Sequence, residues 1–231
     1  MRFIPRPKNP TWNNEQAIAN GCGVAGSHPL EDALIKILND NNLNSKTAAV
    51  FVQSFEPGSL KYMRSHGLNT RVVQLIDAWD VNLKDGSVVY NEITDSRPYD
   101  WTIAGDPRWF DAMLTPAGLA EIKTYADGIG PWKPMIVPLK ITPWPGDSNA
   151  DGTPFTGSTT QASAQPATSL IKDAHAAGLF VHVFTFRNEA KYLAGSYQAV
   201  RMRNIRSSFN WGWMACLLTS PIPPWPHAIA I

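Results

Sequence analysis

Two strand ends in the sequence carry side chains that could bind a polar or anionic ligand. Gln53 ends the apolar run AAVFVQ and Phe55 follows two residues later, and Thr185 and Arg187 lie near the end of the run LFVHVFTFRNE. Gln and Thr offer uncharged hydrogen-bonding groups, and a guanidinium can hold a phosphate or carboxylate with two parallel hydrogen bonds. In a parallel α/β sheet the carboxyl ends of the strands carry the ligand site. We therefore expect these four residues to line a pocket.

Each candidate also has a plainer interpretation. Gln53 and Phe55 could be ordinary core residues, and Arg187 could form a surface ion pair with an acidic neighbour such as Glu189. His182 lies in the middle of the same apolar run, so we expect a buried core histidine there rather than a catalyst. The sequence leaves the first two alternatives open.

The elements that must position these residues follow a repeated strand–helix order. Apolar residues recur at helical spacing in the helical segments, and β-branched and aromatic residues fill the strands. Four such repeats predict a parallel sheet with right-handed crossovers, about half of a (β/α)8 TIM barrel. The strands are expected at 48–53, 70–76, 126–131 and 179–186, and the helices at 30–42, 57–66, 116–126 and 166–178.

Three segments interrupt this pattern. Residues 11–28 are polar and glycine-rich and are predicted to be a loop, and residues 140–165 form a second surface excursion. Residues 77–113 form a long polar insertion with a hairpin at Asp85-Gly86. So long an excursion is usually functional. Its aromatic side chains could form a lip for a ligand or anchor the insertion to the barrel: Tyr99, Trp101, Trp109 and Phe110.

Composition excludes several classes of function. The 231-residue chain has a formal net charge of +1, so it has no electrostatic basis for binding nucleic acid. No apolar run approaches the roughly 20 residues of a membrane span. The two cysteines form no CxxC motif, which argues against a disulfide framework and against a cysteine-rich metal site.

Several strings together resemble the glycerophosphodiester phosphodiesterases, in particular the long-loop branch of bacterial periplasmic and plant enzymes. These strings are VFVQSFEPGSLKYMRSHG, TRVVQLIDA, TPAGLAEIKTYADGIGP and LFVHVFTFRNE, within about residues 8–198. The resemblance covers the C-terminal portion of the family pattern and implies an incomplete TIM barrel, about its strands 3 to 7. It also implies hydrolysis of glycerophosphodiesters to glycerol 3-phosphate and an alcohol, with Ca²⁺ or Mg²⁺. The matched positions imply these substrate-binding residues: Lys8, Gln53, Phe55, Thr185 and Arg187.

The chain departs from the family pattern at its chemical groups. The family's His-Arg pair, its Glu-x-Asp pair and its second histidine have no counterpart, and Arg6 stands where the family has a metal-binding glutamate. A guanidinium would repel a divalent cation. We therefore expect no bound Ca²⁺ or Mg²⁺ and little or no hydrolysis by this chain.

Two alternatives remain from the same residues. One is a non-catalytic half-barrel that binds an anion, such as glycerol phosphate, or docks to another chain. The other is an enzyme with relocated catalysts. In either case we expect one domain over residues 1–231, with no nucleic-acid partner and no membrane span. An incomplete barrel exposes a sheet edge, so self-association through that edge is also expected.

The C-terminal tail is predicted to be irregular. Codons for residues 210–226 can be chosen so that a one-base shift reads LGVDGLFTDFPDTAMA, which resembles the eighth strand of the family. This match predicts that residues 199–231 are an out-of-frame tail and that the chain is a truncated, damaged form of the enzyme.

Overall fold

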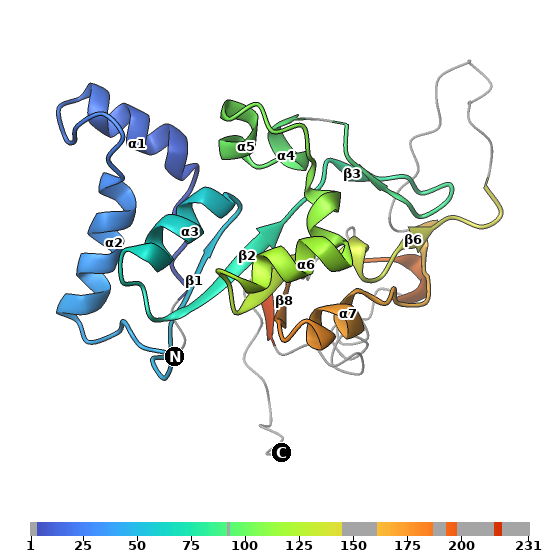
Figure 1. Ribbon diagram of the computed structural model, residues 1–231. Coiled ribbons are helices and arrows are strands. Elements are labelled where there is room, and N and C mark those ends of the chain that lie inside the picture. The colour runs from blue at the N-terminus through green and yellow to red at the C-terminus, as the bar shows by residue number, and fades with distance from the viewer. Residues whose placement is uncertain (1–3, 92, 145–160, 187–192, 198–214, 219–231) are drawn as a thin grey trace.

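A parallel β-sheet forms the centre of the molecule (Figure 1). The computed structural model describes residues 4–91, 93–144, 161–186, 193–197 and 215–218. Within these residues the sheet has five strands, each parallel to its neighbour, and they lie side by side in chain order: β1 (Phe51–Ser54), β2 (Arg71–Ile76), β5 (Gly128–Pro131), β8 (Phe180–Phe186) and β9 (Ala215–Leu218). Strands that follow chain order without reversal are the arrangement of a barrel arc, whereas a doubly wound sheet reverses its order.

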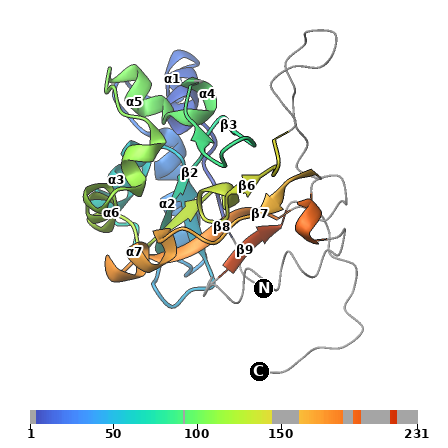
Figure 2. The same cartoon turned by 90° about the vertical axis from the view of Figure 1, so that its right-hand side faces the viewer.

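The connecting helices cover one face of this sheet (Figure 2). The predicted mixed α/β fold with a parallel sheet is thus confirmed. Within the described part of the chain the sheet does not close into a ring. Three helices link successive strands, and two more precede β1, of which α2 packs on α3 and α1 packs on α2: α3 (Pro57–Ser65), α6 (Pro116–Lys123), α7 (Leu170–Ala176), α2 (Pro29–Asp40) and α1 (Pro10–Ala19).

Local sequence signals mark the ends of several helices. Thr115 precedes α6, and its hydroxyl accepts a hydrogen bond from the Gly118 N–H at 3.0 Å, as an N-cap residue does. Gly67 and Gly178 follow α3 and α7 with φ of 90° and 74°, a region that glycine enters without steric cost.

The predicted loop over residues 11–28 is wrong in its first half, where α1 extends to Ala19. This helix presents no regular apolar stripe, so periodicity could not reveal it. Buried polar contacts hold it instead: Asn14 donates to the Glu31 carboxylate at 2.7 Å and accepts from the Leu30 N–H at 3.0 Å. In α2, Ile35 is buried, whereas Ile37 is 56% exposed.

The two excursions contain more regular structure than their composition indicates. The hairpin in the first is confirmed, with Gly86 in its turn at φ 85°. The first excursion contains the hairpin strands β3 (Asp80–Val81) and β4 (Val88–Val89), the helices α4 (Ile93–Ser96) and α5 (Tyr99–Ile103), and the 3₁₀ helix η1 (Phe110–Leu114). At the ends of the second, β6 (Leu139–Lys140) pairs with β7 (Ser163–Ala164). Two further 3₁₀ helices lie outside both excursions, η2 (Lys133–Met135) and η5 (Gly195–Tyr197).

The two edges of the sheet differ from expectation. Inside the tail expected to be irregular, β9 pairs in parallel with β8, and the remaining residues after 197 lie outside the described ranges. At the other edge the Gln53 N–H donates to the Pro5 carbonyl at 3.1 Å. An irregular segment that begins at Ile4 therefore runs beside β1 and covers part of the edge predicted to drive self-association.

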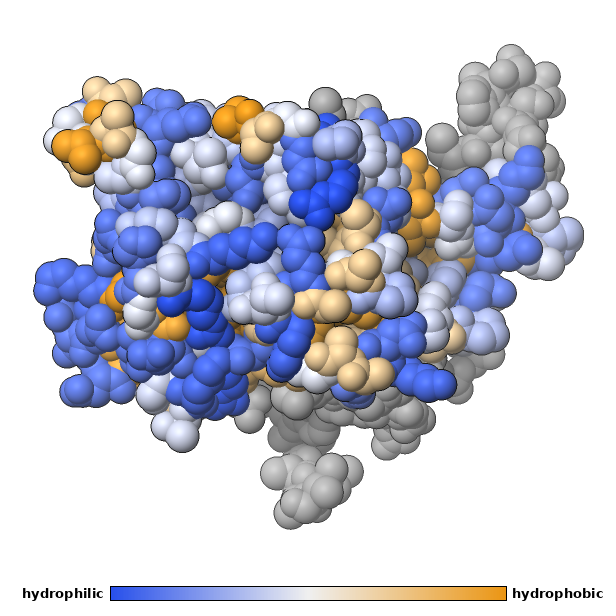
Figure 3. Space-filling view, in the orientation of Figure 1, coloured by the Kyte–Doolittle hydropathy of each residue, from blue (hydrophilic) through white to orange (hydrophobic). Residues whose placement is uncertain are grey.

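Apolar side chains pack on both faces of the sheet. The larger core lies between sheet and helices. The interior face, away from the helices, carries a smaller cluster: Phe51, Val73 and Leu75, with Ile4, Phe55, Phe180 and Phe184 packed against them. The helix-covered surface is mainly hydrophilic, with small separate apolar groups (Figure 3). Among the described helices, we find none with the length and apolarity that a membrane crossing requires.

Candidate functional site

The carboxyl end of β1 brings two predicted residues to one face of the sheet. Side chains alternate along a strand, so Gln53 shares the interior face with Phe51. Phe55 follows the strand and packs edge-to-face on Phe184 of β8, with ring centroids 5.8 Å apart. Its ring also meets Phe110 of the insertion at 6.0 Å. Phe55 thus links the interior face, β8 and the insertion.

Gln53 is the least satisfied polar side chain of this group. It is 7% exposed, and its Oε1 has no hydrogen-bond partner within the described residues. A buried amide oxygen normally has a donor, because desolvation without one costs about 1–3 kcal/mol. The site therefore contains an acceptor that a ligand hydroxyl or N–H can satisfy.

Arg6 lies beside the same ring. Its guanidinium carbon is 5.6 Å from the centroid of Phe55, within cation–π range. The hydrogen bond from Gln53 N–H to the Pro5 carbonyl fixes the backbone next to Arg6. The position that the family gives to a metal-binding glutamate thus places a positive charge at the carboxyl edge of the sheet.

The other predicted site residues, Thr185, Lys8 and Arg187, have no described side-chain contact with Gln53 or Phe55. Thr185 is half-buried in β8 and directly follows Phe184, which contacts Phe55. Lys8 is exposed, and its carbonyl accepts a hydrogen bond from Asn13 Nδ2 at 2.5 Å. Arg187 lies outside the described residues. Of these predicted residues, the structure places Phe55 in contact with Phe184, the residue before Thr185.

Two ionisable residues at this edge were not predicted. Asp77 directly follows β2, and burial raises its pKa to about 6, with a further rise from Asp95 and an opposing effect of Arg6. Lys133 follows β5, and burial lowers its pKa to about 8. Its Nζ lies 5.4 Å from the ring centroid of Phe186. Position at or just beyond the carboxyl end of a strand, the signal that selected Gln53 and Phe55, would have identified both.

Two other polar residues, His182 and Asp127, have structural roles. His182 is 1% exposed, and its ring lies 4.7 Å from the ring centroids of both Phe51 and Phe180, so the predicted core histidine is confirmed. Asp127 lies at the opposite, amino edge of the sheet, where its carboxylate binds Lys46 and Arg64. Neither residue faces the carboxyl edge.

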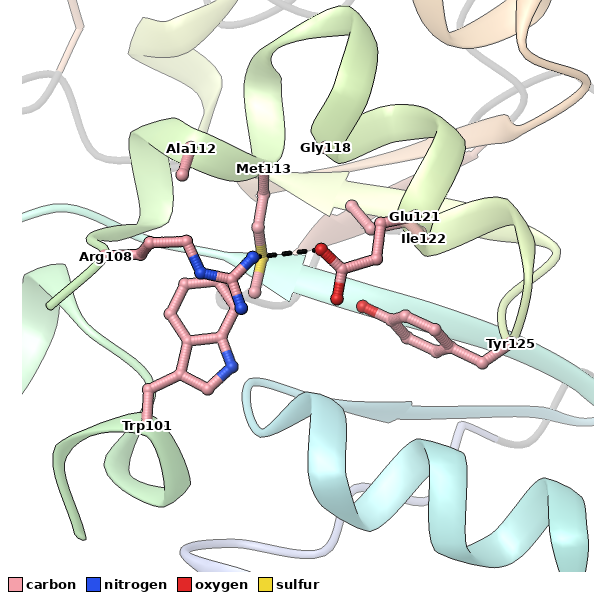
Figure 4. Close-up of a pocket in the computed structure, with 8 residues that line it drawn as sticks. All are labelled: Trp101, Arg108, Ala112, Met113, Gly118, Glu121, Ile122 and Tyr125. Atoms are coloured by element: carbon pink, nitrogen blue, oxygen red, sulfur yellow. Dashed lines mark hydrogen bonds and ion pairs between the residues drawn. The ribbon is translucent and has the colours of Figure 1, made fainter. Parts of the chain in front are cut away.

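A separate small pocket lies among α5, η1 and α6 (Figure 4). Arg108 spans it, with its guanidinium 4.2 Å from the Trp101 ring and ion pairs to Asp106 at 2.7 Å and Glu121 at 3.0 Å. Lys61 of α3 also pairs with Glu121 at 2.9 Å. These contacts join the insertion to α6 and α3, so Trp101 anchors the insertion.

The described residues do not fit the divalent cation that the family resemblance implies. Among them no three His, Cys, Asp or Glu side chains come together as a metal site requires. Arg6 also occupies the expected ligand position. The carboxyl edge carries instead the Arg6 guanidinium, the Gln53 amide and the Phe55 ring.

Comparisons with known proteins agree with the resemblance in the sequence. The chain is 28% identical over 198 residues to the Arabidopsis thaliana glycerophosphodiester phosphodiesterase GDPD6, covering 83% of this chain and 41% of that protein. It is 25% identical over 161 residues to the Haemophilus influenzae glycerophosphodiester phosphodiesterase, covering 68% and 36%. The chain is related to the glycerophosphodiester phosphodiesterases.

This relationship covers only part of the relatives. The chain spans about two fifths of the length of the curated glycerophosphodiester phosphodiesterases that it matches. No family model matches it. A solved Silicibacter pomeroyi structure, whose assignment as a glycerophosphoryl diester phosphodiesterase is provisional, superposes with a TM-score of 0.42 at 14% identity, covering 82% of this chain and 40% of that one.

Proposed function

We propose that this chain supplies ligand-positioning groups of a glycerophosphodiester phosphodiesterase-like barrel and binds a glycerol phosphate at the carboxyl edge of its sheet. The observation that carries the proposal is the buried Gln53 Oε1 without a partner, next to Phe55 and Arg6. Thr185 adds a hydroxyl from β8, and Lys8 and Arg187 are proposed further contacts on the strength of the family match.

The same site supports binding rather than hydrolysis. Metal-assisted phosphodiester hydrolysis needs carboxylates that hold the cation and a group that moves a proton to the leaving alcohol. Two observations support this: the family resemblance aligns Arg6 with a metal-binding glutamate, and no three His, Cys, Asp or Glu side chains of the described residues come together as a metal site requires. We propose accordingly that Ca²⁺ and Mg²⁺ are not required for binding and that hydrolysis by this chain is negligible.

Two measurements on the full 231-residue chain test this proposal. Titration calorimetry with glycerol 3-phosphate should show saturable binding at one site. Release of glycerol 3-phosphate from glycerophosphocholine, followed with and without Ca²⁺, should stay at the rate of the buffer control. Absence of binding would refute the proposal, and calcium-dependent turnover would refute its non-catalytic part.

The second candidate function is phosphodiester hydrolysis by carboxyl groups of the chain itself. Burial raises the pKa of Asp77 to about 6 and that of Glu56 to about 7, so both lie near neutrality, where general acid–base catalysts work best. This candidate predicts turnover with a bell-shaped pH profile. An Asp77→Asn variant would then lose turnover, whereas under the binding proposal there is no turnover to lose.

A further inference from the structure

We propose that the ligand binds in one orientation, with a hydroxyl group donating to Gln53 Oε1 and its anionic group paired with Arg6, which acts in place of a divalent cation. This inference rests on the proposed function and specifies the ligand as a polyol that carries an anionic group. It assigns Arg6 a binding role that the family pattern does not give to this position.

Gln53 selects the hydroxyl end of the ligand. Its Oε1 is an acceptor on a side chain that is 7% exposed, so the ligand must bring a donor to it. The oxygens of an ionised phosphate are acceptors only, whereas an alcohol carries an O–H donor. An amide oxygen therefore discriminates between the two ends of a glycerol phosphate, as buried polar groups reject analogues that leave them unpaired.

Arg6 selects the anionic end. The Phe55 ring lies 5.6 Å from its guanidinium carbon, and Arg6 itself is exposed, so its N–H groups remain accessible to ligand oxygens. Asp77 is close enough for Arg6 to affect its ionisation. A guanidinium is always charged and can bind two phosphate oxygens at once.

The two groups lie on neighbouring chain segments. The Gln53 N–H donates to the carbonyl of Pro5, the residue before Arg6, at 3.1 Å. Phe55 follows Gln53 by two positions and contacts Arg6. A ligand can therefore lie along the aromatic ring with its alcohol toward the sheet interior and its anionic group toward the exposed guanidinium.

Calorimetry with two ligands and two variants tests the orientation. The ligands are glycerol 3-phosphate and n-propyl phosphate, which has the same phosphate and no free hydroxyl. Gln53→Met keeps the length and burial of the side chain, and Arg6→Gln removes the charge. Lys36→Met is the matched control, since Lys36 belongs to an exposed ion pair with Asp40 on α2.

We expect n-propyl phosphate to bind the unchanged protein about tenfold more weakly than glycerol 3-phosphate, as the loss of one hydrogen bond to a buried group implies. Gln53→Met should weaken glycerol 3-phosphate about tenfold and leave n-propyl phosphate unchanged. Arg6→Gln should weaken both ligands about tenfold or more. Lys36→Met and the addition of EDTA should change neither affinity.

The outcomes distinguish the binding orientation from the proposed function. If neither ligand binds, both the orientation and the proposed binding function are wrong. If both ligands bind the unchanged protein equally, the assignment of the ligand hydroxyl to Gln53 Oε1 is wrong, while the proposed binding function is retained. This comparison uses only the unchanged protein and therefore does not depend on whether a variant folds. Binding that is lost with EDTA and restored by Ca²⁺ would overturn the role of Arg6. Equal weakening of both ligands in a folded Gln53→Met would show that Gln53 reads the phosphate instead.

Discussion

Glu56 and Thr11 join the first helix to the end of the first strand through a single oxygen atom. Glu56 Oε2 accepts hydrogen bonds from the Thr11 backbone N–H at 3.0 Å and from the Thr11 hydroxyl at 2.5 Å. Glu56 is 2% exposed and directly follows Phe55 of the candidate site. The link therefore ties the segment that includes Arg6 and α1 to the carboxyl edge of the sheet.

This link predicts a specific pH dependence of stability. Burial raises the pKa of Glu56 from 4.5 to about 7, with the Thr11 bonds opposing the rise. Between these two values the folded state binds more protons than the unfolded state, so the free energy of unfolding falls as pH increases from about 4.5 to 7. The loss is on the order of 2–3 kcal/mol for this group.

Substitution by glutamine tests the cause. Both Thr11 donors reach the same oxygen, so the amide oxygen of Glu56→Gln can accept both while the side chain no longer ionises. Chemical denaturation between pH 4.5 and 8 should show a flatter stability profile for Glu56→Gln than for the unchanged protein, with the largest gain at pH 8. Asp77, whose raised pKa acts in the same direction, retains part of the slope. Parallel profiles would contradict the assignment to Glu56.

Because Trp101 anchors the insertion, its removal should lower the stability of the whole protein and loosen the insertion locally. Trp101 is 8% exposed and lies under Arg108, which pairs with Asp106 and Glu121. Trp101→Ala should lower the free energy of unfolding by about 3 kcal/mol, as other large-to-small core changes do. Limited proteolysis should then cut first within residues 77–113.

The control for this prediction is a surface ion pair. Lys36→Met breaks the exposed contact with Asp40 and should change stability by less than about 0.5 kcal/mol, with no new cleavage. If Trp101→Ala is cleaved at the same sites as the unchanged protein, the aromatic side chain does not hold the insertion in place.

The sequence predicted the parts of the fold that local chemistry determines. The strand runs are β-branched and aromatic, and the Thr115 cap and the glycines at 67 and 178 mark helix ends, so β8 and α6 were found close to their actual bounds. The helix α7 begins four residues later than predicted and ends two residues earlier. The first helix was missed because its stability comes from distant partners. Asn14 meets Glu31 only after the chain has folded, and no periodic pattern records that contact.

The candidate site was predictable only in part, for a similar reason. Gln53 and Phe55 could be chosen because they follow a recognisable strand, but the sequence cannot show that Oε1 of Gln53 lacks a donor. The shifted pKa values of Asp77 and Lys133 arise from burial, which depends on the packing of the insertion and of η2. Position after a strand identifies such residues, whereas their chemical state requires the structure.

Asp127 provides a prediction at the amino edge of the sheet. Burial alone would raise its pKa, but the hydrogen bonds from Lys46 and the Val72 N–H (2.9 Å) and the charge of Arg64 hold it below the usual range. A depressed carboxyl pKa contributes stability that is present above about pH 4 and is lost as pH falls through the folded-state value.

Asp127→Asn should therefore destabilise the protein at pH 7 by about 1–3 kcal/mol, because it leaves two cations without their shared partner. The difference from the unchanged protein should shrink as pH falls below about 4, because Asp127 is protonated there first in the unfolded state and, at lower pH, in the folded state. Thermal unfolding at pH 7 and pH 3 measures both values. A constant difference across this range would show that the charge of Asp127 is not what holds the edge together.

Gly128 gives the last prediction, at the pairing of β5 with β8. A Cβ at this position would collide with the ring of Phe180 and approach the Phe180 carbonyl oxygen to 2.6 Å. Gly128→Ala should therefore destabilise the sheet by about 1–3 kcal/mol through overpacking. Gly67→Ala is the contrasting variant, because its φ of 90° imposes backbone strain of about 1–2 kcal/mol while nothing lies within 4 Å of the new Cβ.

A double-mutant cycle separates the two mechanisms. Phe180→Val frees space next to Gly128, so it should offset part of the cost of Gly128→Ala, with a favourable coupling of about 1 kcal/mol in urea denaturation. The cost of Gly67→Ala should simply add to that of Phe180→Val. Additivity in both pairs would mean that the Phe180 ring does not limit position 128, and that the backbone contact with the Phe180 carbonyl is what requires glycine there.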